Sequence, residues 1–266
     1  MNIIKTSLAL TLFILFPFHA LAGELTGEQI AQVWDKRDDG NTSIAKTKFI
    51  LENKRGQQRI RETIRYWKDY EGQDGIDEKS VLFFLSPPDI RKTGFLNWSY
   101  AEVDKDDDQW LYLPALKKVK RIASDNKEDY FMGTDLTYDD MGDRKIEEDT
   151  FKLLKEETHK GKECYVLEAI PKKKDYMYSK RIIWLDKKEL TEYTVLFYDR
   201  KGKELKKLEE DWIKVSGIWT LKKMYVENFS NGHKTTINIE DVQINPEVND
   251  SVFVKKTLKN ASRFMQ

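Results

Sequence analysis

Histidine and cysteine, the side chains that most often bind transition metals or act as nucleophiles, are scarce in this sequence. Beyond the apolar N-terminal segment the only histidines are His159 and His233, and both lie close to turn glycines. Neither has carboxylates or cysteines at ligand spacing, so we expect exposed turn residues and not metal ligands. Cys164 is alone, which excludes an internal disulfide, and its apolar neighbours favour a buried, unreactive thiol.

Acidic clusters are the other candidates for chemistry. Residues 104–108 begin like a calcium-binding loop, but the sixth position is Gln109 instead of glycine and the twelfth is Ala115 instead of glutamate. A second cluster consists of Asp135, Asp139, Asp140 and Asp143. It could hold a cation or a polar head group, but solvated loop charge explains it better. The sequence also lacks the nucleophile-elbow, zincin and phosphate-loop motifs. We therefore expect no catalytic residue, no metal site and no cofactor, and we do not expect an enzyme.

The first 22 residues have the parts of a secretory signal. A lysine precedes an apolar core at residues 7–18, and Ala20-Leu21-Ala22 places small residues at −3 and −1 of a cut before Gly23. The alternative, an uncleaved anchor, is disfavoured because the core is shorter than the ~20 residues that span a bilayer. Gly23 also replaces the cysteine of a lipoprotein acylation site. We predict cleavage after Ala22 and a periplasmic domain over residues 23–266.

The charge balance restricts the choice of partners. The chain has 46 basic and 46 acidic residues, which gives no reason to expect nucleic acid or a strongly anionic membrane surface as a partner. No apolar segment after the signal approaches the length that spans a membrane. We therefore expect a soluble mature protein, and we expect it to be a monomer.

The element after the signal has the pattern of a short amphipathic helix. Thr26 can cap it, and Gln29 lies at the capping-box position. Ile30, Val33 and Trp34 would share one face of this helix. An Asp-Gly-Asn sequence follows and ends it.

From there the dominant period is two, which is typical of β-strands. Turn sequences such as Asn53–Gly56 and Asn231-Gly232 separate the alternating segments. This spacing predicts a meander of antiparallel strands with one face open to water. The predicted strands are residues 44–52, 58–70, 81–85, 93–102, 109–113, 117–122, 147–157, 162–170, 179–186, 191–200, 204–215, 218–229 and 233–244.

One segment, residues 124–142, breaks the alternation. It is bracketed by acidic residues and carries Phe131, Met132, Leu136 and Tyr138. We predict one or two short helices, or an ordered flap, between the two halves of the sheet.

Aromatic residues are frequent, at 12% of the chain, and many lie in its first half. For any one of them, a place in an ordinary sandwich core is the simpler explanation. Together with the apolar flap, they favour a curved sheet whose concave face holds something apolar. The residues that we expect to line this cavity or its lid are Phe49, Ile64, Tyr66, Phe84, Phe95, Trp98, Trp110, Tyr112, Phe131, Met132, Leu136 and Tyr138.

The run from residue 83 to residue 122 resembles the LolA-like superfamily, and specifically its branch of outer membrane lipoprotein-sorting proteins. The helix, the strand series and the export signal agree with this branch over nearly the whole chain after the signal. The stretches that carry the resemblance are Ser86–Pro88, Gly94–Trp98, Asp108–Pro114, Lys118–Ile122 and Phe131–Tyr138.

The resemblance implies a mainly β fold, an antiparallel half-open β-barrel with an N-terminal helix and a helical lid over an apolar cavity for acyl chains. The founding carriers ferry triacylated lipoproteins from an inner-membrane transporter to an outer-membrane receptor. In those carriers, the arginine of a Lys-Arg-Pro motif ties down the lid. The corresponding residues here are Leu85-Ser86-Pro87, and Arg91 is near but not at the motif position. The resemblance therefore does not extend to that lock, and lipids other than lipoproteins are also candidate cargo.

The predicted function is a periplasmic carrier that binds the acyl chains of a lipoprotein or another lipid and moves them between the inner and outer membranes. Members of this branch resemble partners of inner-membrane RND or MMPL transporters. The alternative is therefore a non-transporting accessory or binding subunit of such a transporter. A third possibility is a small-ligand sensor or structural envelope protein whose small cavity is filled by Trp98, Trp110 and Tyr112.

Overall fold

The computed structural model describes residues 25–265, and the predicted signal peptide lies outside this range. Helix α1 (Gly27–Asp35) has the predicted capping box. The Gln29 N–H donates to Thr26 Oγ1 at 3.2 Å, and the Thr26 N–H donates to Gln29 Oε1 at 2.9 Å. Ile30 is buried, whereas Val33, which we expected on the same face, is 51% exposed. Val33 is exposed because α1 turns the side that carries Gly27 towards β7. The approach there is so close that a Cβ added to Gly27 would lie 2.5 Å from the backbone nitrogen of Leu153.

Thirteen antiparallel strands form one sheet, in the number that the sequence predicts. The strands of the first half are β1 (Thr42–Glu52), β2 (Gln58–Asp69), β3 (Ile76–Ser86), β4 (Gly94–Tyr100), β5 (Asp108–Leu113) and β6 (Lys118–Ile122). Those of the second half are β7 (Asp149–His159), β8 (Lys162–Pro171), β9 (Tyr178–Asp186), β10 (Glu192–Asp199), β11 (Glu204–Val215), β12 (Ile218–Asn228) and β13 (Lys234–Ile244).

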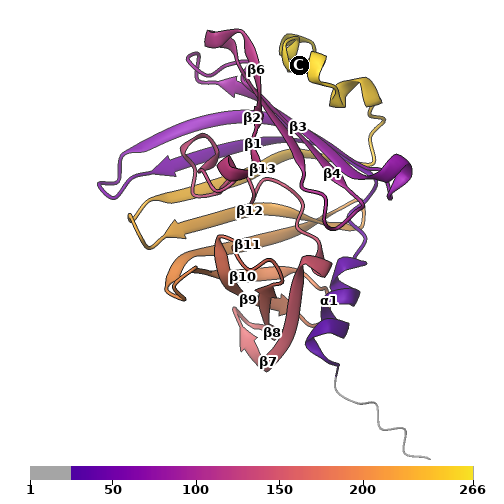
Figure 1. Cartoon of the computed structure of the whole chain (residues 1–266), viewed down its shortest axis with the longest axis vertical. Coiled ribbons are helices and arrows are strands. Elements are labelled where there is room, and N and C mark those ends of the chain that lie inside the picture. Colours follow the sequence, from indigo (N-terminus) through magenta and orange to yellow (C-terminus); the bar gives the residue numbers. More distant parts are fainter. Residues whose placement is uncertain (1–24, 266) are drawn as a thin grey trace, which may run out of the picture.

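The strand order is β6-β5-β4-β3-β2-β1-β13-β12-β11-β10-β9-β8-β7. Each half is a meander, and the pairing of β1 with β13 joins the halves, with Phe49 opposite Ile237. The two end strands, β6 and β7, do not pair, so the sheet curls into an open half-barrel (Figure 1). This is the half-open, antiparallel barrel that the resemblance implies.

Residues 123–148, here called the plug, cross the concave face of the sheet between β6 and β7. They contain three 3-10 turns, Ser124–Asn126, Phe131–Gly133 and Ile146–Glu148. A bridge between Tyr130 and Thr137 closes a tight loop in the middle. The predicted flap is therefore ordered, and its helical content is limited to 3-10 turns.

The C-terminal segment covers part of the opposite, convex face. It contains the 3-10 turn Asp250–Phe253, the short helix α2 (Lys255–Leu258) and a last turn at Ala261–Arg263. It lies against β3, β4 and β5, as Figure 1 shows in yellow. The curved sheet therefore has two apolar layers, one under the plug and one under the C-terminal segment.

Candidate functional site

The sequence-predicted cavity residues divide between the two faces. Those that join the apolar layer under the plug are Phe49, Phe84, Phe95, Phe131, Met132, Leu136 and Tyr138. Those that pack under the C-terminal segment are Ile64, Tyr66, Trp98, Trp110 and Tyr112. The second group therefore does not line the concave groove. The reason is the two-residue period of a strand, which places neighbouring side chains on opposite faces.

The residues of this second group bind the C-terminal segment to the convex face. The indole N–H of Trp98 donates to the carbonyl of Phe253 at 2.8 Å, and the Tyr66 hydroxyl donates to the carbonyl of Phe264 at 2.8 Å. The Phe264 ring also stacks on Phe83. The sequence pattern gave no sign of this segment, because its short turns carry neither strand nor helix periodicity.

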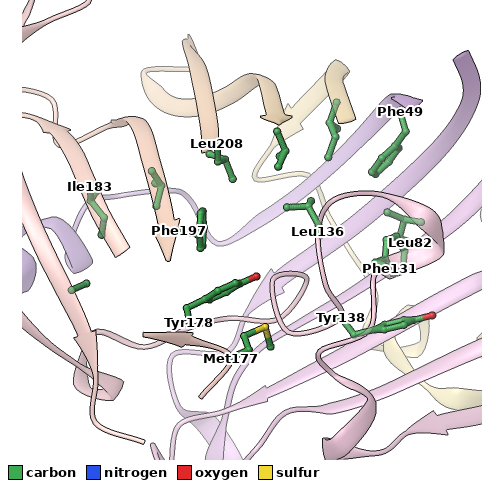
Figure 2. Close-up of a cluster of buried hydrophobic side chains, with 14 of the residues drawn as sticks. Phe49, Leu82, Phe131, Leu136, Tyr138, Met177, Tyr178, Ile183, Phe197 and Leu208 are labelled. Atoms are coloured by element: carbon green, nitrogen blue, oxygen red, sulfur yellow. The ribbon is translucent and has the colours of Figure 1, made fainter. Parts of the chain in front are cut away.

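The concave groove also contains residues that the sequence analysis did not select. Its second-half wall comes from β9 to β12, and alternation within those strands would have identified it. Figure 2 shows Tyr178, Ile183, Phe197 and Leu208 facing the plug residue Leu136. Because both halves of the sheet contribute, the groove is apolar on two sides.

An aromatic cluster fixes the centre of the plug in the groove. The Phe131 side chain is 0% exposed. Its ring centroid lies 5.0 Å from that of Phe95, 6.2 Å from that of Phe84 and 5.5 Å from that of Tyr138. The plug thus fills the apolar groove with its own side chains.

Buried polar contacts tie the plug to β11 and β9. Lys206 forms an ion pair with Asp140 and donates to the carbonyl of Asp135 at 3.2 Å. The Tyr178 hydroxyl is 3.0 Å from both carboxylate oxygens of Asp140. Burial, followed by the charge of Asp140, raises the pKa of Tyr178 well above its ordinary value, which keeps the hydroxyl a donor.

A second tether joins the plug to β13. Asp135 accepts from the Thr235 hydroxyl at 2.7 Å, and its Oδ2 lies 2.7 Å from Nδ1 of His233. Asp135 is buried, so the expectation of solvated loop charge is wrong at this position. His233 is likewise not a free turn residue, since the plug carboxylate holds it. Similarly, His159 bonds Thr194 Oγ1 at 2.9 Å.

Two arginines hold the C-terminal end of the plug. Arg144 donates to both carboxylate oxygens of Asp149 at 2.9 and 2.6 Å, and Arg181 of β9 bonds the same carboxylate. Burial favours the neutral acid, but the hydrogen bonds from Arg144 and the charge of Arg181 outweigh it and lower the pKa of Asp149. Asp149 is therefore a charged anchor, although it is fully buried.

A third arginine contacts the middle of the plug. Arg61 of β2 donates to the carbonyl of Met132. The arginine of the Lys-Arg-Pro motif is absent here, because residues 85–87 are Leu-Ser-Pro. The structure nevertheless supplies an arginine contact to this loop from another strand.

Little free space is left beneath the plug. The cavity there has a volume of about 190 Å³ and is bounded by Leu136, Tyr178, Phe197 and Leu208, among others. Ligand pockets usually measure ~300–1,000 Å³. This cavity is therefore too small for a ligand of acyl-chain size while the plug is in place. Within residues 25–265, no group of three or more His, Cys, Asp or Glu side chains is arranged to hold a metal.

Comparison with known proteins fits this geometry. A family model with the description "-like: Uncharacterized protein" matches residues 76–260. The chain is 37% identical to an outer membrane lipoprotein-sorting protein domain from Vibrio parahaemolyticus. That match covers 88% of this chain and 98% of that one, with a TM-score of 0.82. This chain belongs to the family of outer membrane lipoprotein-sorting protein domains.

Two further solved structures are similar to this chain. A DUF1329 family protein from Desulfovibrio piger is 33% identical, with a TM-score of 0.83 over 87% of this chain and 97% of that one. A LolA superfamily protein from Nitrosomonas europaea has the same fold, with a TM-score of 0.68 and 16% identity over 88% of this chain and 99% of that one. Among curated proteins, none matches significantly. In residues 25–265, no helix has the length and hydropathy needed to cross a bilayer.

Proposed function

We propose that this protein is a non-enzymatic periplasmic carrier, with residues 23–266 as its mature domain. It binds the acyl chains of a lipoprotein or another lipid in the concave groove and carries them between the inner and outer membranes. The observation that supports this most directly is the plug, whose Phe131 and Leu136 occupy the groove as a ligand would. The signal pattern of residues 1–22 and the lipoprotein-sorting relative support the compartment and the class of cargo.

Apolar burial alone does not give such a carrier a direction. A chain of ~16 carbons gains on the order of 12 kcal/mol on leaving water, at ~0.8 kcal/mol per CH₂. The same chain is equally stable in a bilayer, so release requires a groove of moderate affinity. The plug lowers the affinity of the groove to a moderate value. Cargo must first displace the plug side chains that already fill the groove, and the free energy of this displacement reduces the apparent affinity.

The test is saturable binding of a fluorescent fatty-acyl probe to delipidated protein. In Phe131→Asp and Leu136→Asp, a charged group disfavours return of the plug to the groove, so we expect several-fold tighter binding in proteins that still fold. Leu116→Asp is the matched control, because Leu116 is 63% exposed in the turn between β5 and β6. Absence of saturable binding, or affinities that all three variants leave unchanged, would contradict the carrier.

A second candidate is a non-transporting accessory subunit of an inner-membrane RND or MMPL transporter. The observation that favours it is the set of buried tethers on the plug, at Asp135, Asp140 and Arg144, which resist opening. This candidate predicts that purified protein carries no lipid and that a pull-down recovers an inner-membrane transporter. Native mass spectrometry of protein isolated from its own periplasm separates the two, because a carrier should retain an acylated molecule.

A further inference from the structure

The cavity beneath the plug has a polar end. Glu210 of β11 and Glu192 of β10 both line it, together with apolar side chains. In the pairing of β10 with β11, Thr194 lies opposite Glu209, so the two glutamates fall at the same end of the strand pair. Val195 and Leu208 lie opposite each other, next along the cavity.

Glu210 has no partner for one of its oxygens. The residue is 6% exposed, and its Oε2 makes no hydrogen bond to any other described residue. Across residues 25–265, neither Glu210 nor Glu192 takes part in an ion pair within 4.0 Å. Arg181, which lines the same cavity, also has an unpaired Nε, although its terminal nitrogen bonds Asp149.

The environment of Glu210 favours its protonated form. Burial, and then the nearby charge of Glu192, raise the pKa of Glu210 well above its ordinary value. The charge of Arg37 and the nearby Trp212 indole oppose this only in part. A protonated carboxyl is a hydrogen-bond donor. An unpaired donor in a buried site is costly, so such groups usually have a partner, either a ligand or an ordered water.

A donor at one end of an apolar wall suits a specific kind of ligand. We propose that Glu210 donates a hydrogen bond to the acyl carbonyl oxygen of the cargo, whose alkyl chain lies along Val195, Leu208 and Met224. The inference rests on the proposed function and specifies its ligand as an acyl ester, amide or acid, in preference to a plain hydrocarbon chain.

The experiment compares three ligands with the same alkyl chain length: a 1-acylglycerol ester, the 1-alkylglycerol ether that lacks the carbonyl, and the free fatty acid. Each competes with the fluorescent acyl probe on the wild-type protein. We expect the ester to bind about three- to tenfold more tightly than the ether, which corresponds to one net hydrogen bond. The free acid should also bind more tightly than the ether. Whichever of the ester and the acid binds more tightly then identifies the source of the carbonyl.

Two variants test the residue. Glu210→Leu should abolish the preference for the ester but keep ether binding, whereas Glu210→Gln, which retains a donor, should keep the preference. The matched control is Glu209→Leu, since Glu209 precedes Glu210 and forms ion pairs with Lys160 and Lys207 outside the cavity. Equal affinities for ester and ether in the wild type, or a preference that survives Glu210→Leu, overturn the inference.

The outcomes separate the inference from the function on which it rests. Equal, saturable binding of ester and ether overturns the role of Glu210 and leaves the carrier intact. Absence of saturable binding by every ligand overturns both. The wild-type comparison needs no variant, so the inference remains falsifiable even if Glu210→Leu does not fold.

Discussion

Lys206 of β11 forms an ion pair with Asp140 of the plug that is almost completely withdrawn from solvent. Lys206 is 0% exposed, and its ammonium lies 4.7 Å from the centroid of the Phe197 ring and 5.0 Å from that of Tyr178. The loop that fills the groove is therefore held by charge as well as by apolar contact. A ligand that displaces the plug must break this pair or move it as a unit.

Lys206→Met should lower the free energy of unfolding by about 3 kcal/mol, since removing one partner leaves a buried charge uncompensated. Methionine keeps the apolar contacts with Phe197. Urea denaturation measures the loss, and hydrogen exchange should show faster exchange in residues 129–140. Lys203→Met, at an exposed position directly before β11, is the control. A loss equal to that of the control would show that the pair does not hold the plug.

Phe253→Ala tests the assignment of the convex layer. Phe253 belongs to the C-terminal segment and is fully buried in the apolar layer beneath it, so the substitution should cost about 3–5 kcal/mol of the free energy of unfolding. The affinity of the folded protein for the acyl probe should not change, because this layer lies on the other side of the sheet from the groove. Denaturation and probe titration measure the two quantities, with Lys259→Ala at an exposed site as the control. Weaker probe binding by Phe253→Ala would argue that the ligand uses the convex face.

Much of the fold could be predicted from local patterns. The capping box at Thr26 and the alternation from β7 to β13 are encoded in short stretches of sequence, because a cap and a strand depend mainly on their own residues. The plug was recognisable because residues 124–142 break the alternation. The half-open curvature was predicted from the family resemblance, because the sequence of a single strand does not determine how the whole sheet curves.

The candidate site was less predictable. On β4, Phe95 faces the plug and Trp98 faces the C-terminal segment, and composition alone does not distinguish them. Which face is concave depends on the curl of the whole sheet. The tethers could not be predicted either, since Asp135 and His233 are 98 residues apart and meet only in the folded chain.

Glu78→Gln should make stability less dependent on pH. Burial, and then the charge of Asp143, raise the pKa of Glu78 to about 8, from an ordinary value of 4.5. Between these values the folded protein keeps a proton that the unfolded chain has lost. The free energy of unfolding therefore falls as pH rises through this window, by up to about 1.4 kcal/mol per pH unit.

Glutamine cannot titrate, but its amide oxygen can still accept from the Trp67 indole N–H, which lies 2.5 Å from Glu78 Oε2. Urea denaturation at intervals from about pH 5 to pH 8 should therefore show a shallower decline for Glu78→Gln than for the wild type. Glu62→Gln, at an exposed position of β2, is the control for loss of a surface carboxylate. Parallel pH profiles for wild type and Glu78→Gln would contradict a raised pKa at this position.

Arg61→Gln should increase the affinity for the acyl probe. Arg61 donates to the Met132 carbonyl in the plug and does not line the cavity beneath it, so its loss weakens the closed state without removing a ligand contact. A hydrogen bond from a charged group contributes ~1.5–3 kcal/mol, and part of this is recovered from water after the plug opens. An increase in affinity of about three- to tenfold follows if the open state is the minor one.

The control is Arg59→Gln, which removes the same charge from an exposed position two residues earlier on β2. Probe titration gives the affinities, and hydrogen exchange in residues 129–138 reports whether the plug has loosened. Faster exchange with unchanged affinity would show that opening the plug does not limit ligand entry. Weaker binding by Arg61→Gln alone would show that Arg61 contacts the ligand, and that the plug contact is secondary.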